Sequence, residues 1–266
     1  MFKQYFGLKF NPFSKEILPE QLFENQELIE VSSRLNYLQN SRGIGLLVGE
    51  AGSGKSTALR KYVNALNPAL YKPCYFALST VTVGEFYYGL ALELGEQPQH
   101  KKVAVFHQIQ QAINSLYYDR RITPVIILDE IHMAKNSVLE ELRMLFNFKM
   151  DSQNPFILIM AGQPLIRNKL SLNINNPLKQ RIVVNYFLRG LKLEEIAQYF
   201  ESRLKLAGIN EEIFRPIALE VIHSITNGLP RVVNNLATAC LLSACGQKQR
   251  YVDEETVYKA QQDLDL

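Results

Sequence analysis

The stretch Gly49–Ser56, GEAGSGKS, constrains this chain more than any other feature. It follows an apolar run at residues 43–49, GIGLLVG, and opens a run of helix formers at residues 54–66. Its spacing fits G-x-x-x-x-G-K-S/T, a pattern in which backbone N–H groups wrap phosphate oxygens at glycines where a Cβ would collide. The stretch therefore predicts a buried strand, a phosphate-binding loop and a helix whose N-terminus faces the anion.

Short apolar runs predict further buried strands, and stretches with helical spacing separate them. The predicted strands cover residues 43–49, 74–79, 125–130 and 156–162. The predicted helices cover residues 21–40, 54–66, 83–94, 103–118 and 137–149. This alternation predicts βαβ crossovers, and therefore an α/β fold of three αβα layers around a parallel sheet.

The pattern changes near residue 190, after which only helix-like segments follow, separated by Gly and Pro. We expect a nucleotide-binding αβα domain at residues 1–190, including an aromatic N-terminal segment. Residues 191–266 are expected to form a small all-helical domain.

Charge and composition indicate further what class of protein this is. The net charge is +3, and the excess of Lys and Arg lies in residues 1–190, where a polyanion is expected to bind. The three cysteines show no paired metal-binding spacing, and the N-terminus shows no signal-peptide pattern. Since no run of about 18 apolar residues occurs, we expect a cytoplasmic protein with no membrane span.

The second motif is PVIILDEIH, which carries Asp129 and Glu130 to the end of a predicted strand. Ligands bind at the carboxyl edge of open parallel sheets. Asp129 is expected to hold Mg²⁺, directly or through water, and Glu130 to accept a proton from the water that attacks the γ-phosphate. Adjacent carboxylates also occur simply as solvated strand ends, but a phosphate loop ahead of them favours the metal interpretation.

This pair of motifs resembles the AAA+ ATPases, which implies ATP and Mg²⁺ as cofactors and catalytic roles for Lys55 and Glu130. In FILIMAGQP, the resemblance makes Gln163 the polar residue that positions the attacking water, although Asn, Ser or Thr is commoner there. In NPLKQRIV, it makes Arg181 an arginine finger for the nucleotide of a neighbouring subunit. An ordinary surface arginine is the alternative for Arg181.

In the helical part, NGLPRVVNNL resembles the sensor-2 element of the AAA+ lid, with Arg231 in the first turn of a helix that Pro230 begins. The metal ligands are expected to be Ser56 and Asp129. The expected nucleotide-binding residues are Gly49, Glu50, Ala51, Gly52, Ser53, Gly54, Lys55, Ser56, Thr57, Asp129 and Arg231.

Four further stretches resemble the ExeA-type branch of this family: YFGLKFNPF, LDEIH with LEELRMLFNF, AGQPLIRNKL and LKQRI. That branch contains a general-secretion ATPase and the TnsC, TniB and MuB type of transposition helper. The transposition side implies sequence-nonspecific binding to double-stranded DNA, a transposase partner, and a homo-oligomeric ring or helical filament of about six or more subunits per turn. Secretion members continue beyond the lid, so the end of this chain leads us to expect the transposition side.

Two alternatives stay open beside that interpretation. The first is a secretion-associated ATPase that remodels or assembles envelope proteins without DNA. The second is a nucleotide-gated interaction module with negligible hydrolysis, against which Glu130 and Arg181 argue because a mere binder needs neither.

The resemblance also locates contacts with DNA and the packing of the N-terminus. Loops carrying Thr80, Thr82, Lys101 and Lys102 are expected to offer hydroxyls and charges to phosphates, the alternative being a solvated loop. The rings of Phe2, Phe6, Phe10 and Phe13 are expected to pack on the ATPase core near the adenine. His132, next to the carboxylates, is expected to be an ordinary polar neighbour.

Overall fold

The computed structural model describes residues 2–78 and 80–265. Its contacts divide the chain into two compact units. The first comprises Met1–Ile29, Gly52–Gly54 and Arg189–Leu266, and the second comprises Glu30–Ala51 and Lys55–Leu188. The predicted boundary near residue 190 coincides with one of these divisions, whereas the N-terminal segment groups with the C-terminal helices.

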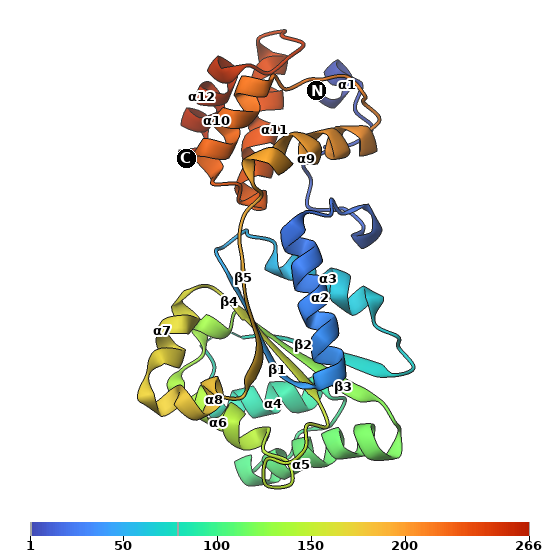
Figure 1. The fold of residues 1–266 in the computed structure, drawn as a ribbon, viewed down its shortest axis with the longest axis vertical. Coiled ribbons are helices and arrows are strands. Elements are labelled where there is room, and N and C mark those ends of the chain that lie inside the picture. Colours follow the sequence, from blue (N-terminus) through green and yellow to red (C-terminus); the bar gives the residue numbers. More distant parts are fainter. Residues whose placement is uncertain (1, 79, 266) are drawn as a thin grey trace. The chain divides into compact units, whose positions relative to one another are not determined.

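The second unit is built on one sheet of five parallel strands (Figure 1). Their order across the sheet is β2-β3-β4-β1-β5. The strands are β1 (Gly43–Gly49), β2 (Tyr71–Ala77), β3 (Thr123–Asp129), β4 (Ile157–Gly162) and β5 (Ile182–Leu188).

Helices connect these strands and make up most of the first unit. In the second unit they are α3 (Lys55–Ala65), α4 (Val83–Glu93), α5 (Lys102–Asn114), α6 (Asn136–Leu145), α7 (Leu165–Ser171) and α8 (Asn176–Lys179). The first unit holds α1 (Phe2–Phe6), α9 (Leu193–Leu206), α10 (Pro216–Thr226), α11 (Pro230–Gly246) and α12 (Glu254–Asp263). Helix α2 (Gln26–Ser41) begins in the first unit and continues into the second.

The buried strands are easier to predict from the sequence than the edge strands. Strands β1 and β4 are buried along their whole length, and β3 is buried from its second residue onward. Such strands read as continuous apolar runs, as expected of a parallel sheet covered on both faces. The edge strands β2 and β5 are only partly buried. The predicted αβα class with a parallel sheet is confirmed.

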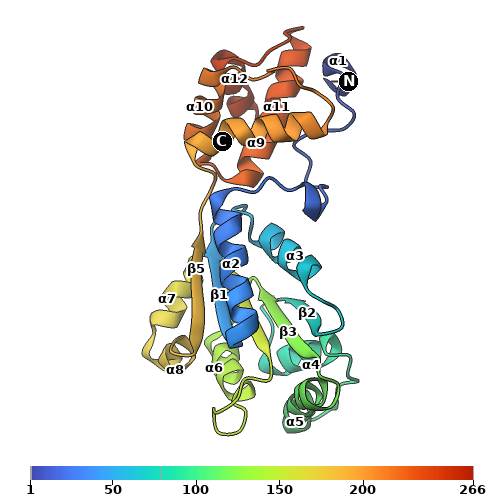
Figure 2. The same ribbon diagram turned by 45° about the vertical axis from the view of Figure 1, so that its right-hand side comes forward.

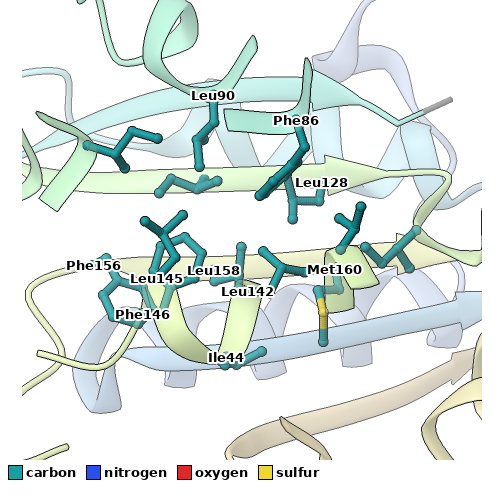
Figure 3. Close-up of a cluster of buried hydrophobic side chains, with 14 of the residues drawn as sticks. Ile44, Phe86, Leu90, Leu128, Leu142, Leu145, Phe146, Phe156, Leu158 and Met160 are labelled. Carbon is teal, nitrogen blue, oxygen red and sulfur yellow. The ribbon is translucent and has the colours of Figure 1, made fainter. Parts of the chain in front are cut away.

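The two faces of the sheet are covered by different helices. On one face, side chains from α4 and α6 pack with Ile44, Leu128, Leu158 and Met160 of the strands (Figure 3). Buried side chains of α5 belong to the same cluster. The other face carries α2, which lies along β1 in Figure 2. A Cβ on Gly45 would lie only 2.7 Å from a methyl carbon of Leu38 in α2, so the glycine allows this helix to approach closely.

Two strand predictions needed correction. Strand β2 spans Tyr71–Ala77, whereas residues 74–79 were predicted, of which residue 79 lies outside the described residues. The half-exposed Tyr71 and Lys72 hide the beginning of the strand from a search for apolar runs. Strand β5 was missed altogether. It is an edge strand whose exposed Val183 and Asn185 interrupt the apolar pattern.

The first unit has a core of its own, in which the N-terminal aromatic rings take part. Phe6 and Phe13 are buried, and Phe2 packs against the same cluster of helical side chains. The ring of Phe13 lies 4.8 Å from that of Phe200 and 5.8 Å from that of Phe214. The expected packing on the αβα core is therefore wrong for Phe2, Phe6 and Phe13, since their contacts are with helices of the C-terminal part.

Phe10, the fourth ring of that prediction, is 37% exposed and belongs to no buried cluster of the described residues. None of the described helices is both long and apolar enough to cross a membrane.

Candidate functional site

The loop from Gly49 to Ser56 joins β1 to α3 and folds around a lysine. Lys55 is the first residue of α3 and is 6% exposed. Its Nζ donates hydrogen bonds to the carbonyl oxygens of Gly49 at 2.8 Å and Glu50 at 2.9 Å. Gly54 has φ of +102°, in the left-handed region that favours glycine. The motif therefore forms a closed turn in which the ammonium group of Lys55 is positioned by the strand end.

A buried hydroxyl in this loop fits the binding of an anion. Ser53 is 3% exposed, and its Oγ has no hydrogen-bond partner among the described residues. Buried polar groups are nearly always paired in folded proteins. A ligand oxygen is the partner that a phosphate-binding loop offers to such a hydroxyl.

Asp129, the last residue of β3, is the centre of the polar contacts next to this loop. It is 3% exposed. Its Oδ2 accepts the Ser56 hydroxyl at 3.4 Å and the Tyr75 hydroxyl at 2.9 Å. Its Oδ1 accepts the backbone N–H of Glu130 at 2.9 Å. The two expected metal ligands, Ser56 and Asp129, are thus in contact.

Tyr75 was not among the predicted site residues, yet it contacts one of them directly. Burial, the hydrogen bond to Asp129 and the negative charges of Asp129 and Glu130 raise the pKa of the Tyr75 phenol to about 12. The phenol therefore stays protonated near neutral pH and acts as the donor to the carboxylate.

Glu130 adopts a conformation that turns the chain away from the strand. Its φ is +56° and its ψ is 32°, a left-handed conformation that costs a non-glycine residue energy and is often found at functional sites. Its carboxylate is partly exposed, and one oxygen lies 3.4 Å from Nδ1 of His132. A partly exposed carboxylate beside the phosphate loop can accept a proton from a bound water.

His132 connects the acidic pair to the end of β4. It is 7% exposed, and its Nδ1 lies 3.3 Å from the backbone nitrogen of Gln163. A Cβ on Gly162 would lie 2.9 Å from a methyl carbon of Ile131, so only glycine permits this close approach of β4. The structure thus places His132 in contact with both Glu130 and the backbone of Gln163. The sequence predicted only that His132 is an ordinary polar neighbour of the acidic pair.

Arg181 lies at the opposite edge of the sheet. It precedes β5, whose first residue Ile182 is paired with Ile44 near the start of β1. Its guanidinium forms an ion pair with Asp151 at 2.9 Å and donates to the carbonyl of Arg143 at 2.8 Å. Among the described residues, the Arg181 side chain contacts Asp151 and Arg143 and not the phosphate loop, so its role as an arginine finger stays a prediction.

Arg231 belongs to the first unit, in the first turn of α11. Its backbone N–H donates to the carbonyl of Gly52, which belongs to the same unit, at 3.2 Å. A Cβ on Gly52 would lie 2.8 Å from Cβ of Arg231, and the φ of Gly52 is +82°. The contact is made by backbone atoms, and the expected contact between the guanidinium and phosphates stays a prediction.

The four residues predicted to contact DNA are all exposed. The side chains of two of them already contact other residues of the chain. The Thr82 hydroxyl caps α4 by accepting the N–H of Glu85 at 3.3 Å, and it donates to the Glu85 carboxylate at 2.8 Å. Lys102 forms an ion pair with Glu141. The side chains of Thr80 and Lys101 form no hydrogen bond or ion pair within the described part of the chain, and DNA contacts at all four positions stay predictions.

The structure also contains a cavity that is separate from this site. Its volume is about 360 Å³, and it lies near the amino ends of β3 and β4. Its lining residues are Gln110, Asn114, Tyr118, Asn147, Phe148 and Lys149. None of them is a predicted site residue.

A parallel sheet in which β1 ends in a glycine-rich loop with a buried lysine, next to the acidic end of β3, defines a P-loop nucleotide-binding protein. Residues 38–170 match the family model described as an AAA domain, which covers half of the chain. The chain therefore belongs to this family, and it is an AAA+ ATPase.

Known proteins resemble this chain in sequence or in fold. General secretion pathway protein A from Aeromonas hydrophila is 30% identical over 249 residues, which are 92% of this chain and 45% of that protein. This chain thus spans less than half the length of that relative. Cdc6p from Pyrobaculum aerophilum has a similar fold, with a TM-score of 0.70 at 17% identity, over 95% of this chain and 70% of that one.

The Aeropyrum pernix ORC1 protein, solved in complex with DNA, also has a similar fold. Its TM-score is 0.63 at 16% identity, and the similarity covers 95% of this chain and 68% of that one. At such identities the likeness shows the fold, while the secretion relative supports the ExeA-like branch of the family.

Proposed function

We propose that this chain hydrolyses ATP with Mg²⁺ at the carboxyl edge of its sheet. One observation carries the proposal: the Ser56 hydroxyl and the Asp129 carboxylate are 3.4 Å apart, beside the loop that Lys55 closes. A hydroxyl and a carboxylate are hard oxygen ligands, and sites for Mg²⁺ and nucleotides commonly combine one or two carboxylates with substrate phosphates. The residues present therefore fit the metal.

Each residue of the chain has a distinct role in this proposal. Lys55 and the loop N–H groups bind the phosphates, and Mg²⁺, when bound, neutralises charge that develops on them. Glu130 takes the proton of the attacking water, and Gln163 positions that water. His132 lies beside both residues and fixes where they lie relative to each other.

The variant Glu130→Gln tests this assignment. We expect phosphate release to fall by about 100-fold or more, since general-base catalysis commonly contributes about 10²- to 10⁴-fold. ATP affinity should stay within about twofold of wild type because the amide has the same shape. The matched control is Glu93→Gln, on exposed surface at the end of α4. Normal turnover by Glu130→Gln would remove this residue from its role.

We further propose that ATP controls sequence-nonspecific binding of this ATPase to double-stranded DNA, and that the chain acts with a transposase. Three observations support this proposal. The excess of basic residues lies in residues 1–190, four sequence stretches resemble the ExeA-type branch to which transposition helpers belong, and similar folds include an ORC1 protein solved with DNA. In this scheme ATP binding favours a homo-oligomer on DNA, and hydrolysis releases it.

The secretion relative supports a second candidate, an ATPase that acts on envelope proteins and needs no DNA. The supporting observation is the 30% identity over 92% of this chain. The two candidates share the nucleotide site and differ in their partner, so a test of the partner separates them.

Fluorescence anisotropy of a random-sequence duplex separates the candidates. The transposition proposal predicts binding with ATP, weaker binding with ADP, and a steep loss of affinity as salt rises, because phosphate contacts release counterions. The variant Lys55→Ala should bind DNA equally with and without ATP. Absence of binding in every nucleotide state would favour the secretion candidate.

A further inference from the structure

We propose that Tyr75 is a positioning residue that holds the Asp129 carboxylate in the orientation needed to bind Mg²⁺. The inference rests on the proposed ATPase function and adds to it Tyr75, a residue that lies outside the motifs identified in the sequence. It concerns atoms of the second unit alone.

The sheet register places Tyr75 and Asp129 on the same face. Tyr75 is paired with Ile127 of β3, and Asp129 lies two residues further along that strand. Residues two apart on a strand share a face and are separated by about 7 Å. A tyrosine ring is long enough to span this offset, whereas a shorter polar side chain at position 75 is not.

The contacts of Asp129 leave each of its oxygens with a defined partner. Oδ1 accepts the N–H of Glu130 at 2.9 Å, which fixes one side of the carboxylate. Oδ2 accepts Tyr75 at 2.9 Å, a shorter contact than the 3.4 Å to Ser56. Tyr75 is therefore the stronger of the two side-chain donors that fix Oδ2.

Loss of the phenol hydroxyl has a predictable result. A carboxylate oxygen has two lone pairs, so Oδ2 can accept from Tyr75 with one and offer the other to a metal on the side of Ser56. Without the Tyr75 hydroxyl, only the longer Ser56 contact restrains Oδ2, and the orientation of the carboxylate is held mainly by the Glu130 N–H at Oδ1. A metal that depends on this oxygen then binds more weakly, because the orientation of its ligand is less firmly fixed.

The test measures metal binding directly, with Mn²⁺ as the probe. Mn²⁺ binding is followed by electron paramagnetic resonance with a saturating, non-hydrolysable ATP analogue, and binding of a fluorescent ADP analogue is measured in EDTA. For Tyr75→Phe we expect the Mn²⁺ midpoint to rise by about 10- to 100-fold, the usual effect of removing a hydrogen-bond partner of a metal ligand. Binding of the ADP analogue in EDTA should not change.

The matched control is Tyr71→Phe. Tyr71 lies on the same strand and the same face, four residues or about 13 Å earlier along β2. Its hydroxyl is not a partner of Asp129, so the Mn²⁺ midpoint should stay at the wild-type value. Both variants keep the aromatic ring, and their melting temperatures show whether either change disturbs the fold.

Three outcomes would overturn the inference. An unchanged or lower Mn²⁺ midpoint in Tyr75→Phe would show that the hydroxyl does not support the metal site. An equal loss of ADP binding in EDTA would assign Tyr75 a general structural role. Wild-type protein that binds the ATP analogue without any effect of metal would instead refute the proposed Mg²⁺ site itself, which separates that failure from the first two.

Discussion

At the scale of single residues, we expect nucleotide binding to depend directly on Lys55. Its buried ammonium group is held by two backbone carbonyls at the end of β1, so it is already positioned for a phosphate. We expect Lys55→Ala to weaken ATP binding by about 10- to 100-fold, the loss of hydrogen bonds to a charged group. Isothermal titration calorimetry measures this affinity.

The control for this prediction is Arg60→Ala, an exposed cation on the same helix. It should leave the ATP affinity within about twofold of wild type. Equal losses in the two variants would mean that general positive charge, and not the position of Lys55, determines the affinity.

The sequence predicts some site residues much better than others. Lys55 and Ser56 begin a helix and Asp129 ends a strand, each within a short motif, so their chemistry can be read from neighbours in the chain. Tyr75 could not be found this way, because its contact with Asp129 depends on the register of β2 against β3. The nearness of His132 to Gln163 likewise depends on how β4 pairs with β3.

At the scale of elements, Thr82 lies at the N-cap of α4, where capping and DNA contact can be told apart. Its hydroxyl caps the helix in a reciprocal capping box with Glu85. We expect Thr82→Ala to lower the free energy of unfolding by about 1 kcal/mol, the usual cost of losing such a cap. Urea unfolding measures the change, and Thr80→Ala should alter it by less than about 0.5 kcal/mol.

DNA affinity of the same two variants separates capping from DNA contact. If Thr82 serves only as a cap, Thr82→Ala binds DNA like wild type at temperatures where the protein is folded. A loss of DNA affinity without loss of stability would contradict the capping explanation.

The loop between α6 and β4 restrains Arg181. Lys149, Met150 and Asp151 all have positive φ values, and Asp151 forms the ion pair with Arg181. Pairs with one exposed partner contribute about 0.2 to 1 kcal/mol. If Arg181 serves a neighbouring subunit, Asp151→Asn should raise oligomer-dependent phosphate release by up to about fivefold, measured across protein concentrations.

Asn168→Ala, on the exposed surface of α7, is the control for Asp151→Asn. An unchanged or lower rate in Asp151→Asn would show that the ion pair does not compete with a catalytic use of Arg181.

Elements with continuous apolar runs could be predicted from sequence, and edge elements could not. Strands β1, β3 and β4 are buried on both faces and were located closely. Strand β5 is partly exposed and was missed, although it pairs along β1. The packing of Phe6 and Phe13 with C-terminal helices depends on long-range contacts that no local pattern reveals.

For the whole molecule, the account predicts that ATP and self-association are linked. A nucleotide bound between subunits stabilises the oligomer by mass action. Light scattering should therefore give a larger mass with a non-hydrolysable ATP analogue than with ADP, and the difference should grow with protein concentration. The same mass in both nucleotide states would contradict this linkage.

The central claim is that this chain hydrolyses ATP at the site formed by Lys55, Ser56, Asp129 and Glu130. Phosphate release by the purified chain, with ATP and either Mg²⁺ or excess EDTA, tests it most directly. The account predicts turnover that requires Mg²⁺ and is lost in Lys55→Ala. Tight ATP binding without turnover, in Mg²⁺ and across protein concentrations with DNA present or absent, would contradict it.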